Sequence, residues 1–193
     1  MSKFTYRIAS RRIMAKDWSS LWHVEVEARG ADGKVKLLPR EVADHGDGAA
    51  VLPIDKARGT VLLVRQWRTG AAFNNEHDGW LIEACAGLLD GDDPMQCARR
   101  EAHEELGVNI QNVRHVADCF SSPGAVAERL VLFVADYTEQ DRVDGGGGLA
   151  HEDEDIEVIE MPLAESFAMI ASGGIMDAKT IILLQHAMLL SKT

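Results

Sequence analysis

The chain has 193 residues and carries 31 acidic against 20 basic side chains, a formal net charge of −11. This charge argues against a nucleic-acid backbone or an anionic membrane as the main partner, although a bound metal ion can invert the local field and admit nucleotides. The N-terminus lacks the apolar run of a signal peptide, no apolar stretch reaches transmembrane length, and the three cysteines lack zinc spacing, so we expect a cytoplasmic protein.

The first region, residues 1–44, predicts a small antiparallel β-sheet. From Trp22 to Arg29 apolar and polar residues alternate, which is the period of a half-buried strand. The turn residues Asp32 and Gly33 then predict a hairpin. Two or three strands are rarely stable alone. We therefore expect this sheet to pack on the main domain or on a second subunit.

The second region, residues 45–193, predicts the main domain. Expected strands cover residues 49–54, 60–65, 80–84, 113–119, 130–137 and 156–161, a polar loop covers 69–79, and helices cover 163–172 and 178–190. The pair 49–54 and 60–65 predicts a hairpin. Together with one more helix between the third and fourth strands, this pattern predicts an α/β/α sandwich with a mixed sheet.

That additional helix has clear start and stop signals. Asp93 followed by Pro94 predicts an N-cap and a first helical residue. Gly107 predicts the residue that ends the helix. A loop rich in glycine and aspartate, from Gly87 to Asp92, precedes it.

Three glutamates crowd one edge of this helix. At about 100° per residue, Glu105 lies about 40° and Glu104 about 60° from Glu101 around the axis. Like charges this close repel each other, and a divalent cation would remove the conflict, since Mg²⁺ accepts carboxylates together with phosphate oxygens and waters. A solvated acidic face is the simpler alternative. Arg100 directly before Glu101, and two alanines suited to packing on a sheet, favour the metal site.

Cationic and aromatic residues elsewhere have two interpretations each. Arg68 ends a predicted strand and is either a surface residue or a ligand for a diphosphate, whose oxygens a guanidinium matches in bidentate fashion. Lys179 opens a predicted helix, where the dipole favours anions, so a cation there could help to hold a phosphate. Trp18 is either a packing residue or a stacking platform for a base.

A tetraglycine at residues 145–148 leads into the acids Glu152, Asp153 and Glu154. Such a loop is usually solvated, yet hydrolysis needs a group that positions or deprotonates water, and a mobile acid can arrive with substrate and metal. We expect Glu154 to bind the metal, with Asp153 or Glu152 near the water or the sugar. Glu128 either accepts hydrogen bonds from a ligand or has a plain surface role.

These motifs resemble the Nudix hydrolase family, whose box reads Gly-X5-Glu-X7-Arg-Glu-U-X-Glu-Glu-X-Gly-U, with U aliphatic. The second half matches from Arg100 to Val108, with Ala102 at the first U. The first half departs, because only four residues separate Gly87 from Asp92, and Asp92 stands where the family has glutamate. The resemblance implies the α/β/α fold and attack of water on a diphosphate.

The resemblance narrows to the GDP-mannose pyrophosphatase group, relatives of the ADP-ribose pyrophosphatases. Matching segments are residues 40–42, 64–68, 83–90, 122–124, 152–158 and 179–180. The short box loop agrees with this group. The implied reaction is hydrolysis of GDP-mannose to GMP and mannose 1-phosphate with Mg²⁺, or Mn²⁺ as an alternative. Pro39 and Trp18 depart from the group at base recognition, where a basic residue and a smaller aromatic are expected.

The resemblance also implies roles for individual residues. The expected metal ligands are the Ala86 carbonyl, Glu101, Glu105 and Glu154. The expected catalytic residues are Glu104, Glu105, Glu152, Asp153 and Glu154, with Glu104 in a supporting role. The expected contacts to the sugar nucleotide are Trp18, Pro39, Arg40, Glu41, Arg68, Ala86, Gly87, Leu88, Glu128, Asp153, Glu154 and Lys179. Trp18 and residues 39–41 would come from the other subunit of a homodimer that exchanges its N-terminal sheets.

Three other functions stay open. The nearest is hydrolysis of ADP-ribose or another nucleoside diphosphate sugar by the same chemistry. A module that senses a nucleotide without cleaving it would not need the complete set of box glutamates. A purely structural dimer would not account for the tetraglycine and acidic loop.

Overall fold

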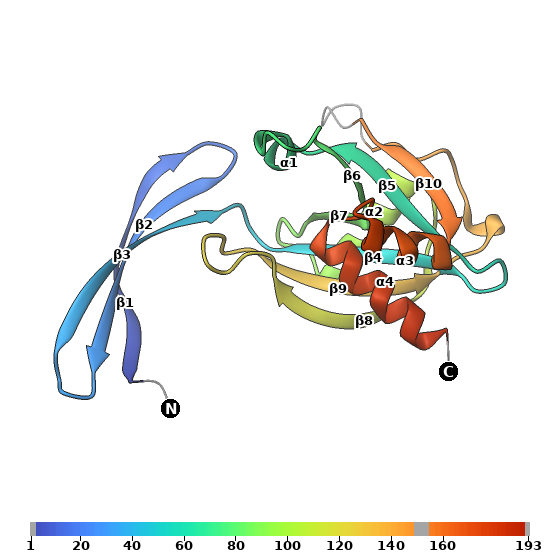
Figure 1. Cartoon of the computed structure of the whole chain (residues 1–193). Helices are drawn as coiled ribbons and strands as arrows, with labels where there is room; N and C mark the ends of the chain where they lie inside the picture. The colour runs from blue at the N-terminus through green and yellow to red at the C-terminus, as the bar shows by residue number, and fades with distance from the viewer. Residues whose placement is uncertain (1–2, 149–154, 192–193) are drawn as a thin grey trace. The chain divides into compact units, whose positions relative to one another are not determined.

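The computed structural model describes residues 3–148 and 155–191. The chain divides into two compact units (Figure 1). The first comprises Met1–Asp47 and Phe120–Arg129, and the second comprises Gly48–Cys119 and Leu130–Thr193. Within the described ranges, no helix is long and apolar enough to cross a membrane.

The second unit is built on a seven-stranded mixed sheet. Its strands are β4 (Gly48–Asp55), β5 (Thr60–Trp67), β6 (Trp80–Glu83), β7 (Cys85–Leu88), β8 (Gln111–Phe120), β9 (Arg129–Asp136) and β10 (Glu157–Pro162). The order is β10-β5-β4-β9-β8, with β6 paired to β5 and β7 paired to β4. β4 and β9 run parallel, whereas β5 is antiparallel to β4, β6 and β10.

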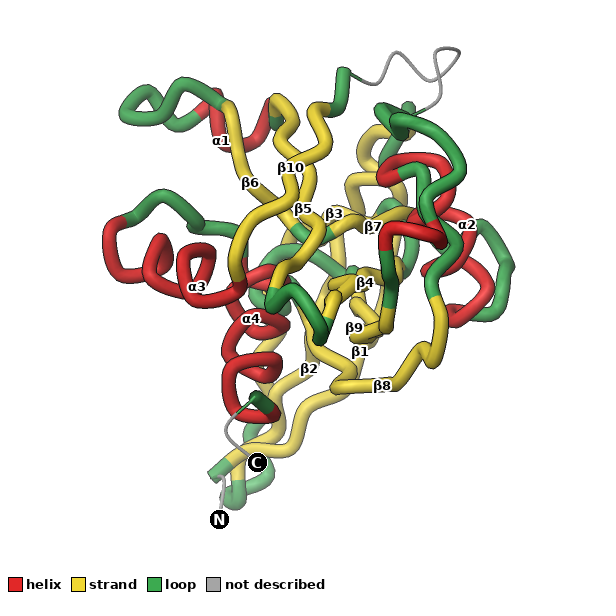
Figure 2. The backbone as a smooth tube through the Cα atoms, turned by 90° about the vertical axis from the view of Figure 1, so that its right-hand side faces the viewer, coloured by secondary structure: helices red, strands yellow, loops and turns green. Residues whose placement is uncertain are grey.

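Helices cover both faces of this sheet. Figure 2 shows α2 (Pro94–Leu106) on one side and α3 (Leu163–Ser172) with α4 (Ala178–Leu190) on the other. The predicted α/β/α sandwich is therefore confirmed. A 3-10 helix, η1, covers Glu139–Asp141. The expected loop over residues 69–79 is wrong at its start, where α1 (Thr69–Phe73) forms because its two alanines favour a helical turn.

The β4–β5 hairpin opens just beyond its turn. The two strands pair only where Ile54 and Asp55 face Val61 and Thr60. Further along, β6 pairs with β5 and β7 pairs with β4, so one extended segment continues the sheet on both sides of the opening. Ala84, between β6 and β7, is fully buried. The sequence predicted an ordinary hairpin and a single strand here, because diverging strands leave no local signal.

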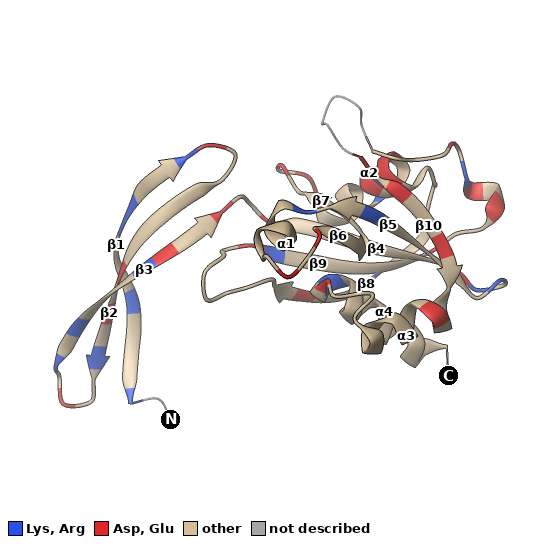
Figure 3. Ribbon diagram, turned by 45° about the horizontal axis from the view of Figure 1, so that its top comes forward, with Lys and Arg blue, Asp and Glu red and all other residues tan. Residues whose placement is uncertain are grey.

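The first unit contains a three-stranded antiparallel sheet, as predicted. Its strands are β1 (Phe4–Lys16), β2 (Ser20–Gly30) and β3 (Val35–Asp44), in that order. The register places Tyr6 opposite Ala28 and Ile8 opposite Val26 on one apolar face. Tyr6 and Ile8 nevertheless remain 61% and 64% exposed. Both signs of charge recur along these strands (Figure 3). One sheet face therefore lacks an apolar cover within the described chain.

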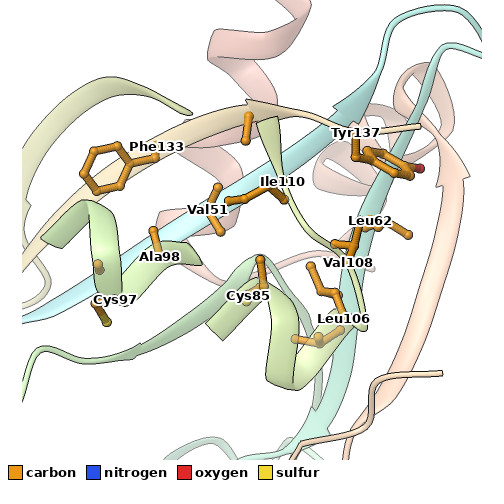
Figure 4. Close-up of a cluster of buried hydrophobic side chains, with 14 of the residues drawn as sticks. Val51, Leu62, Cys85, Cys97, Ala98, Leu106, Val108, Ile110, Phe133 and Tyr137 are labelled. Atoms are coloured by element: carbon orange, nitrogen blue, oxygen red, sulfur yellow. The ribbon is translucent and has the colours of Figure 1, made fainter. Parts of the chain in front are cut away.

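The larger sheet, by contrast, has a buried apolar cluster on each face. Under α2, Cys97, Ala98 and Leu106 from the helix pack with Val51 and Leu62 from the strands (Figure 4). The second cluster joins the other face to α3 and α4. Ala98 and Ala102, the two alanines that were expected to pack α2 closely on the sheet, are fully buried. This packing fixes the rotation of α2 and places its glutamates beside β7.

Candidate functional site

The ends of α2 follow local signals that the sequence shows. The Asp93 side chain accepts hydrogen bonds from the backbone N–H groups of Met95 and Gln96, at 3.0 and 3.3 Å. Pro94 is the first helical residue, and Gly107 ends the helix in the left-handed region, with φ of 63°. Both predicted ends are confirmed. The helix therefore presents its glutamates in the expected phase.

Two of these glutamates lie against the backbone of β7. The Ala86 N–H donates to Glu105 Oε2 at 3.3 Å. A Cβ atom built on Gly87 would lie 1.9 Å from Glu101 Oε1, so only a glycine leaves room for this carboxylate. Glu101 and Glu105 are 8% and 2% exposed. The predicted metal ligands Ala86, Glu101 and Glu105 are thus brought together, at a place where two carboxylates are nearly withdrawn from water.

Arg100 joins the acidic edge of α2 to the loop before it. Its guanidinium contacts Glu101 at 2.7 Å and Glu104 at 3.1 Å, and it donates to the Leu88 carbonyl at 3.3 Å. Asp92 lies 3.7 Å away. Burial opposes the charge of Arg100, but the neighbouring glutamates outweigh it and raise the pKa of the guanidinium. Asp92, which stands in the shortened loop where the family has glutamate, thus faces the arginine.

Glu83, at the end of β6, is the centre of a second charged group. It is 2% exposed and accepts hydrogen bonds from Arg68 Nη2 and from Lys179 Nζ, both at 2.8 Å. Burial would raise the pKa of Glu83, but the two cations outweigh it and hold that pKa below its usual range. Arg68 and Lys179, separated by more than a hundred positions in the sequence, therefore meet on one carboxylate.

The start of α4 is held so that Lys179 reaches this carboxylate. Asp177 caps the helix by accepting from the Thr180 N–H at 3.0 Å, and it also lies 3.0 Å from the Lys179 ammonium. The Thr180 hydroxyl accepts from the Ala84 N–H at 2.7 Å, which ties the helix to the segment between β6 and β7. The unfavourable placement of a lysine at a helix start is thus offset by two carboxylates.

The acidic edge of α2 lies close enough to the cations around Glu83 for their charges to interact. Burial opposes the charge of Arg68, but Glu83 and also Glu105 raise the pKa of its guanidinium. Arg68 therefore interacts electrostatically with both Glu83 and the acidic edge of α2. Figure 3 marks acidic residues on α2 and a basic residue near the end of β5. A region with carboxylates on one side and cations on the other suits a metal ion together with a phosphorylated ligand.

The remaining expected metal ligand and loop acids lie outside the described residues. They are Glu152, Asp153 and Glu154. Among the residues that the structure describes, no group of three His, Cys, Asp or Glu side chains is placed to hold a metal ion. Glu101 and Glu105 are two carboxylates, and carboxylate oxygens are ligands that a hard cation such as Mg²⁺ accepts together with further oxygen ligands.

Other expected substrate contacts belong to the first unit. Trp18 is 76% exposed, and one of its faces stacks on His45, with ring centroids 5.1 Å apart. His45 Nε2 lies 3.3 Å from Glu128 Oε1. The structure thus connects Trp18 to Glu128 through a histidine. The expected contacts Pro39, Arg40 and Glu41 lie exposed on β3.

Sequence reasoning missed two residues that organise these groups. Glu83 showed one usable signal, a charge at the end of the otherwise apolar run Trp80–Glu83. A buried charge needs partners, so that position should have been paired with the two cations. His45, which backs Trp18, gave no signal, because a lone histidine after a strand has no distinctive spacing.

Comparison with known proteins identifies the family of this chain. The NUDIX domain family model matches residues 44–181. A protein named GDP-mannose pyrophosphatase from Pectobacterium atrosepticum is 45% identical over 182 residues, covering 94% of this chain and 93% of that protein. Proteins of the same name from Klebsiella pneumoniae subsp. pneumoniae and Escherichia coli O9:H4 are 45% and 41% identical over 175 residues, covering 91% of this chain and 87% and 91% of their own lengths. The chain belongs to the Nudix hydrolase family.

Proposed function

We propose that this enzyme hydrolyses the diphosphate bond of a nucleoside diphosphate sugar. The observation that carries the proposal is the pairing, in one unit, of the acidic edge Glu101–Glu105 with the cations Arg68 and Lys179. A diphosphate is the common ligand class that needs both, because its oxygens bind a divalent cation and guanidinium or ammonium groups together.

The basic side chains of this site would bind the phosphoryl oxygens, and the acidic side chains would bind the metal ion. Arg68 and Lys179 are oriented by Glu83 and would bind phosphoryl oxygens and stabilise the negative charge that develops on them during hydrolysis. Glu101 and Glu105, with the Ala86 carbonyl, would hold the metal ion. Glu104 is engaged by Arg100 and would support the edge without touching the metal.

The proposed metal is Mg²⁺, with Mn²⁺ as an alternative, and Glu154 is the proposed further ligand. When bound, such an ion supplies Lewis-acid stabilisation of the phosphoryl oxygens. Glu152 or Asp153 would lie near the water or the sugar. The tetraglycine before these acids is the feature that supports a loop able to approach a bound substrate.

For the substrate we propose GDP-mannose, with GMP and mannose 1-phosphate as products. The names of relatives at 40–45% identity, over more than nine-tenths of this chain, support this choice. A panel of GDP-mannose, other GDP-sugars and ADP-ribose, assayed with Mg²⁺ for release of phosphomonoesters, tests it. The highest kcat/KM should fall on GDP-mannose. Preference for ADP-ribose would move the assignment to the neighbouring group.

The metal site has its own test. Glu105→Gln should lower turnover by orders of magnitude while urea denaturation stays close to wild type. Glu165→Gln, an exposed glutamate of α3, is the matched control and should leave turnover unchanged. Near-normal turnover of Glu105→Gln would refute the assignment of the metal ligands.

We further propose a homodimer that exchanges its N-terminal sheets. The support is the apolar face of the first unit, on which Tyr6 and Ile8 are exposed, since such faces mark interaction sites. Ile8→Glu should then shift the protein from dimer to monomer in sedimentation equilibrium. Thr5→Glu, on the opposite face of the same strand, should not. A monomeric wild-type protein at micromolar concentration would contradict the proposal.

Exchange makes a second, sharper prediction, because Arg40 of one subunit would serve the site of the other. Glu105→Gln and Arg40→Ala subunits should each have low activity alone. Mixed dimers of the two should regain activity, since one of their two sites would contain only intact residues. Mixtures that stay inactive although subunits exchange would place Arg40 in the site of its own subunit.

The boundary near residue 44 and a cytoplasmic location complete the proposal. The family match beginning at residue 44 supports the boundary. The three cysteines, Cys85, Cys97 and Cys119, are all free, which suits a reducing compartment.

A further inference from the structure

The Nε2 atom of the buried Gln66 amide has no hydrogen-bond partner among the described residues. Gln66 lies on β5 and is 7% exposed. Its Nε2 atom is buried and finds no acceptor among the residues that the structure describes. Buried amide groups are almost always paired, because an unmade hydrogen bond in a dry environment costs free energy. A buried amide nitrogen without a partner points to an acceptor that is supplied by a bound ligand.

The strand register places this amide on the face that carries the site. Leu62 and Val64 of β5 belong to the apolar cluster under α2. Alternation along a strand puts Gln66 on that same face. Val64 lies opposite Glu83 and Gln66 lies opposite Leu81, and residues directly opposite each other point to one face. The pair of Gln66 and Leu81 is therefore the next pair on this face after the pair of Val64 and Glu83, and Glu83 is the carboxylate that Arg68 and Lys179 share.

The chemistry of the neighbours selects the missing partner. Gln66 offers an N–H donor, and two residues further along Arg68 offers a guanidinium, so the groups here favour an acceptor of negative charge. A phosphoryl oxygen accepts hydrogen bonds without having to donate one. A sugar hydroxyl also carries a proton that needs its own acceptor.

We propose that Gln66 Nε2 donates a hydrogen bond to a phosphoryl oxygen of the bound diphosphate. This inference rests on the proposed function and deepens it by adding a neutral donor to the two cations. The hydrogen bond satisfies an amide nitrogen that has no acceptor among the described residues. Gln66 is then a substrate-binding residue that acts on the part common to all nucleoside diphosphate sugars.

The substitution Gln66→Met separates binding from structure. Methionine is also unbranched and fills similar space, and it removes the unpaired amide, so the midpoint of urea denaturation should hold or rise. In the same protein, kcat/KM for GDP-mannose should fall by about ten- to a hundredfold, which corresponds to losing one hydrogen bond to a charged group. Gln66→Glu keeps the length and replaces the donor by an anion, and it should lose at least as much.

Gln111→Met is the control, because Gln111 is an exposed strand glutamine whose amide donates to the Asn109 carbonyl at 3.1 Å. It should keep wild-type kcat/KM. For Gln66→Met, the loss should be equal for every sugar nucleotide that the wild-type enzyme hydrolyses, since the diphosphate is common to them.

Each other outcome overturns a defined part of the inference. Wild-type kcat/KM in a stable Gln66→Met protein would make the unpaired amide a structural imperfection. A loss confined to one sugar or one base would move the contact away from the diphosphate. If the wild-type enzyme hydrolyses no sugar nucleotide, the proposed function fails first and the contact with it. A wild-type enzyme that is active, with an unaffected variant, refutes the Gln66 contact alone.

Discussion

Replacing Gly87 with alanine tests whether the position of the Glu101 carboxylate matters for catalysis separately from its charge. The added Cβ would meet Glu101 Oε1 at 1.9 Å and Cδ at 2.2 Å. Gly87 does not have a positive φ, so alanine adds no backbone strain. The new methyl group therefore acts on the end of one flexible side chain and on little else.

The size of the effect follows from that geometry. To reach an ordinary contact distance of at least 3.4 Å, the Glu101 oxygen must retreat by about 1.5 Å from its position at 1.9 Å. A misplacement of about 1 Å in a catalytic group can cost about a hundredfold in rate. We therefore expect Gly87→Ala to lower kcat/KM by about a hundredfold. Because the Glu101 side chain is buried and contacts Arg100, displacing it should lower the free energy of unfolding by about 1–3 kcal/mol, which leaves the protein folded.

The assay is Mg²⁺-dependent release of phosphomonoester from GDP-mannose, with urea denaturation measured in parallel. Gly70→Ala is the matched control, because a Cβ on Gly70 meets no atom within 4 Å, and it should keep wild-type activity. Adding Gly87→Ala to Glu101→Gln should cause little further loss, since both changes act through one carboxylate. Wild-type activity in Gly87→Ala, or full additivity with Glu101→Gln, would refute the reasoning.

Three further predictions concern stability. Glu83→Gln should lower the free energy of unfolding by about 3 kcal/mol, as breaking a buried ion pair does. Because the pKa of Glu83 is lowered in the folded protein, the difference in unfolding free energy between this variant and the wild type should be full above about pH 4.5 and should shrink as the pH falls further. A difference that does not change with pH would contradict this. Burial opposes the charge of Asp136, but hydrogen bonds from its cationic neighbours lower its pKa from 3.8 to about 2. Asp136→Asn should therefore lower the free energy of unfolding, measured by urea denaturation at pH 7, by about 2 kcal/mol. This difference from the wild type should be lost between about pH 4 and pH 2. Thr180→Val leaves the buried Ala84 N–H without its acceptor and should lower thermal stability by about 1–3 kcal/mol, whereas an unchanged melting temperature would show that this bond contributes nothing.

Elements with local signals could be predicted from the sequence. The start of α2 at Pro94 and its end at Gly107 follow from an N-cap, a proline and a glycine that act within one turn. Both C-terminal helices also begin and end at the predicted residues. By contrast, the opening of the β4–β5 hairpin was not predicted. It depends on β6 pairing with residues of β5 that lie 13 to 19 positions earlier and on β7 pairing with residues of β4 that lie 34 to 40 positions earlier, and the two pairings together exceed any short window of sequence.

The candidate site divides in the same way. Glu101, Glu104 and Glu105 were found because a helix fixes the angle between residues three and four apart. Arg68 and Lys179 were selected as single cations, but their shared carboxylate was overlooked. Glu83 reads in sequence as the last residue of a short apolar strand.

What the sequence by itself determined is therefore the chemistry of one helix edge, since helical spacing turns a run of glutamates into a set of neighbouring carboxylates. Only the tertiary structure decided what opposes that edge. Glu83 gathers Arg68 and Lys179 from positions 15 residues before it and 96 residues after it, because a charge buried in the sheet must find cations wherever the fold brings them. The same fold buries Gln66 on that face with an amide nitrogen from which no residue in the described part of the chain accepts a hydrogen bond.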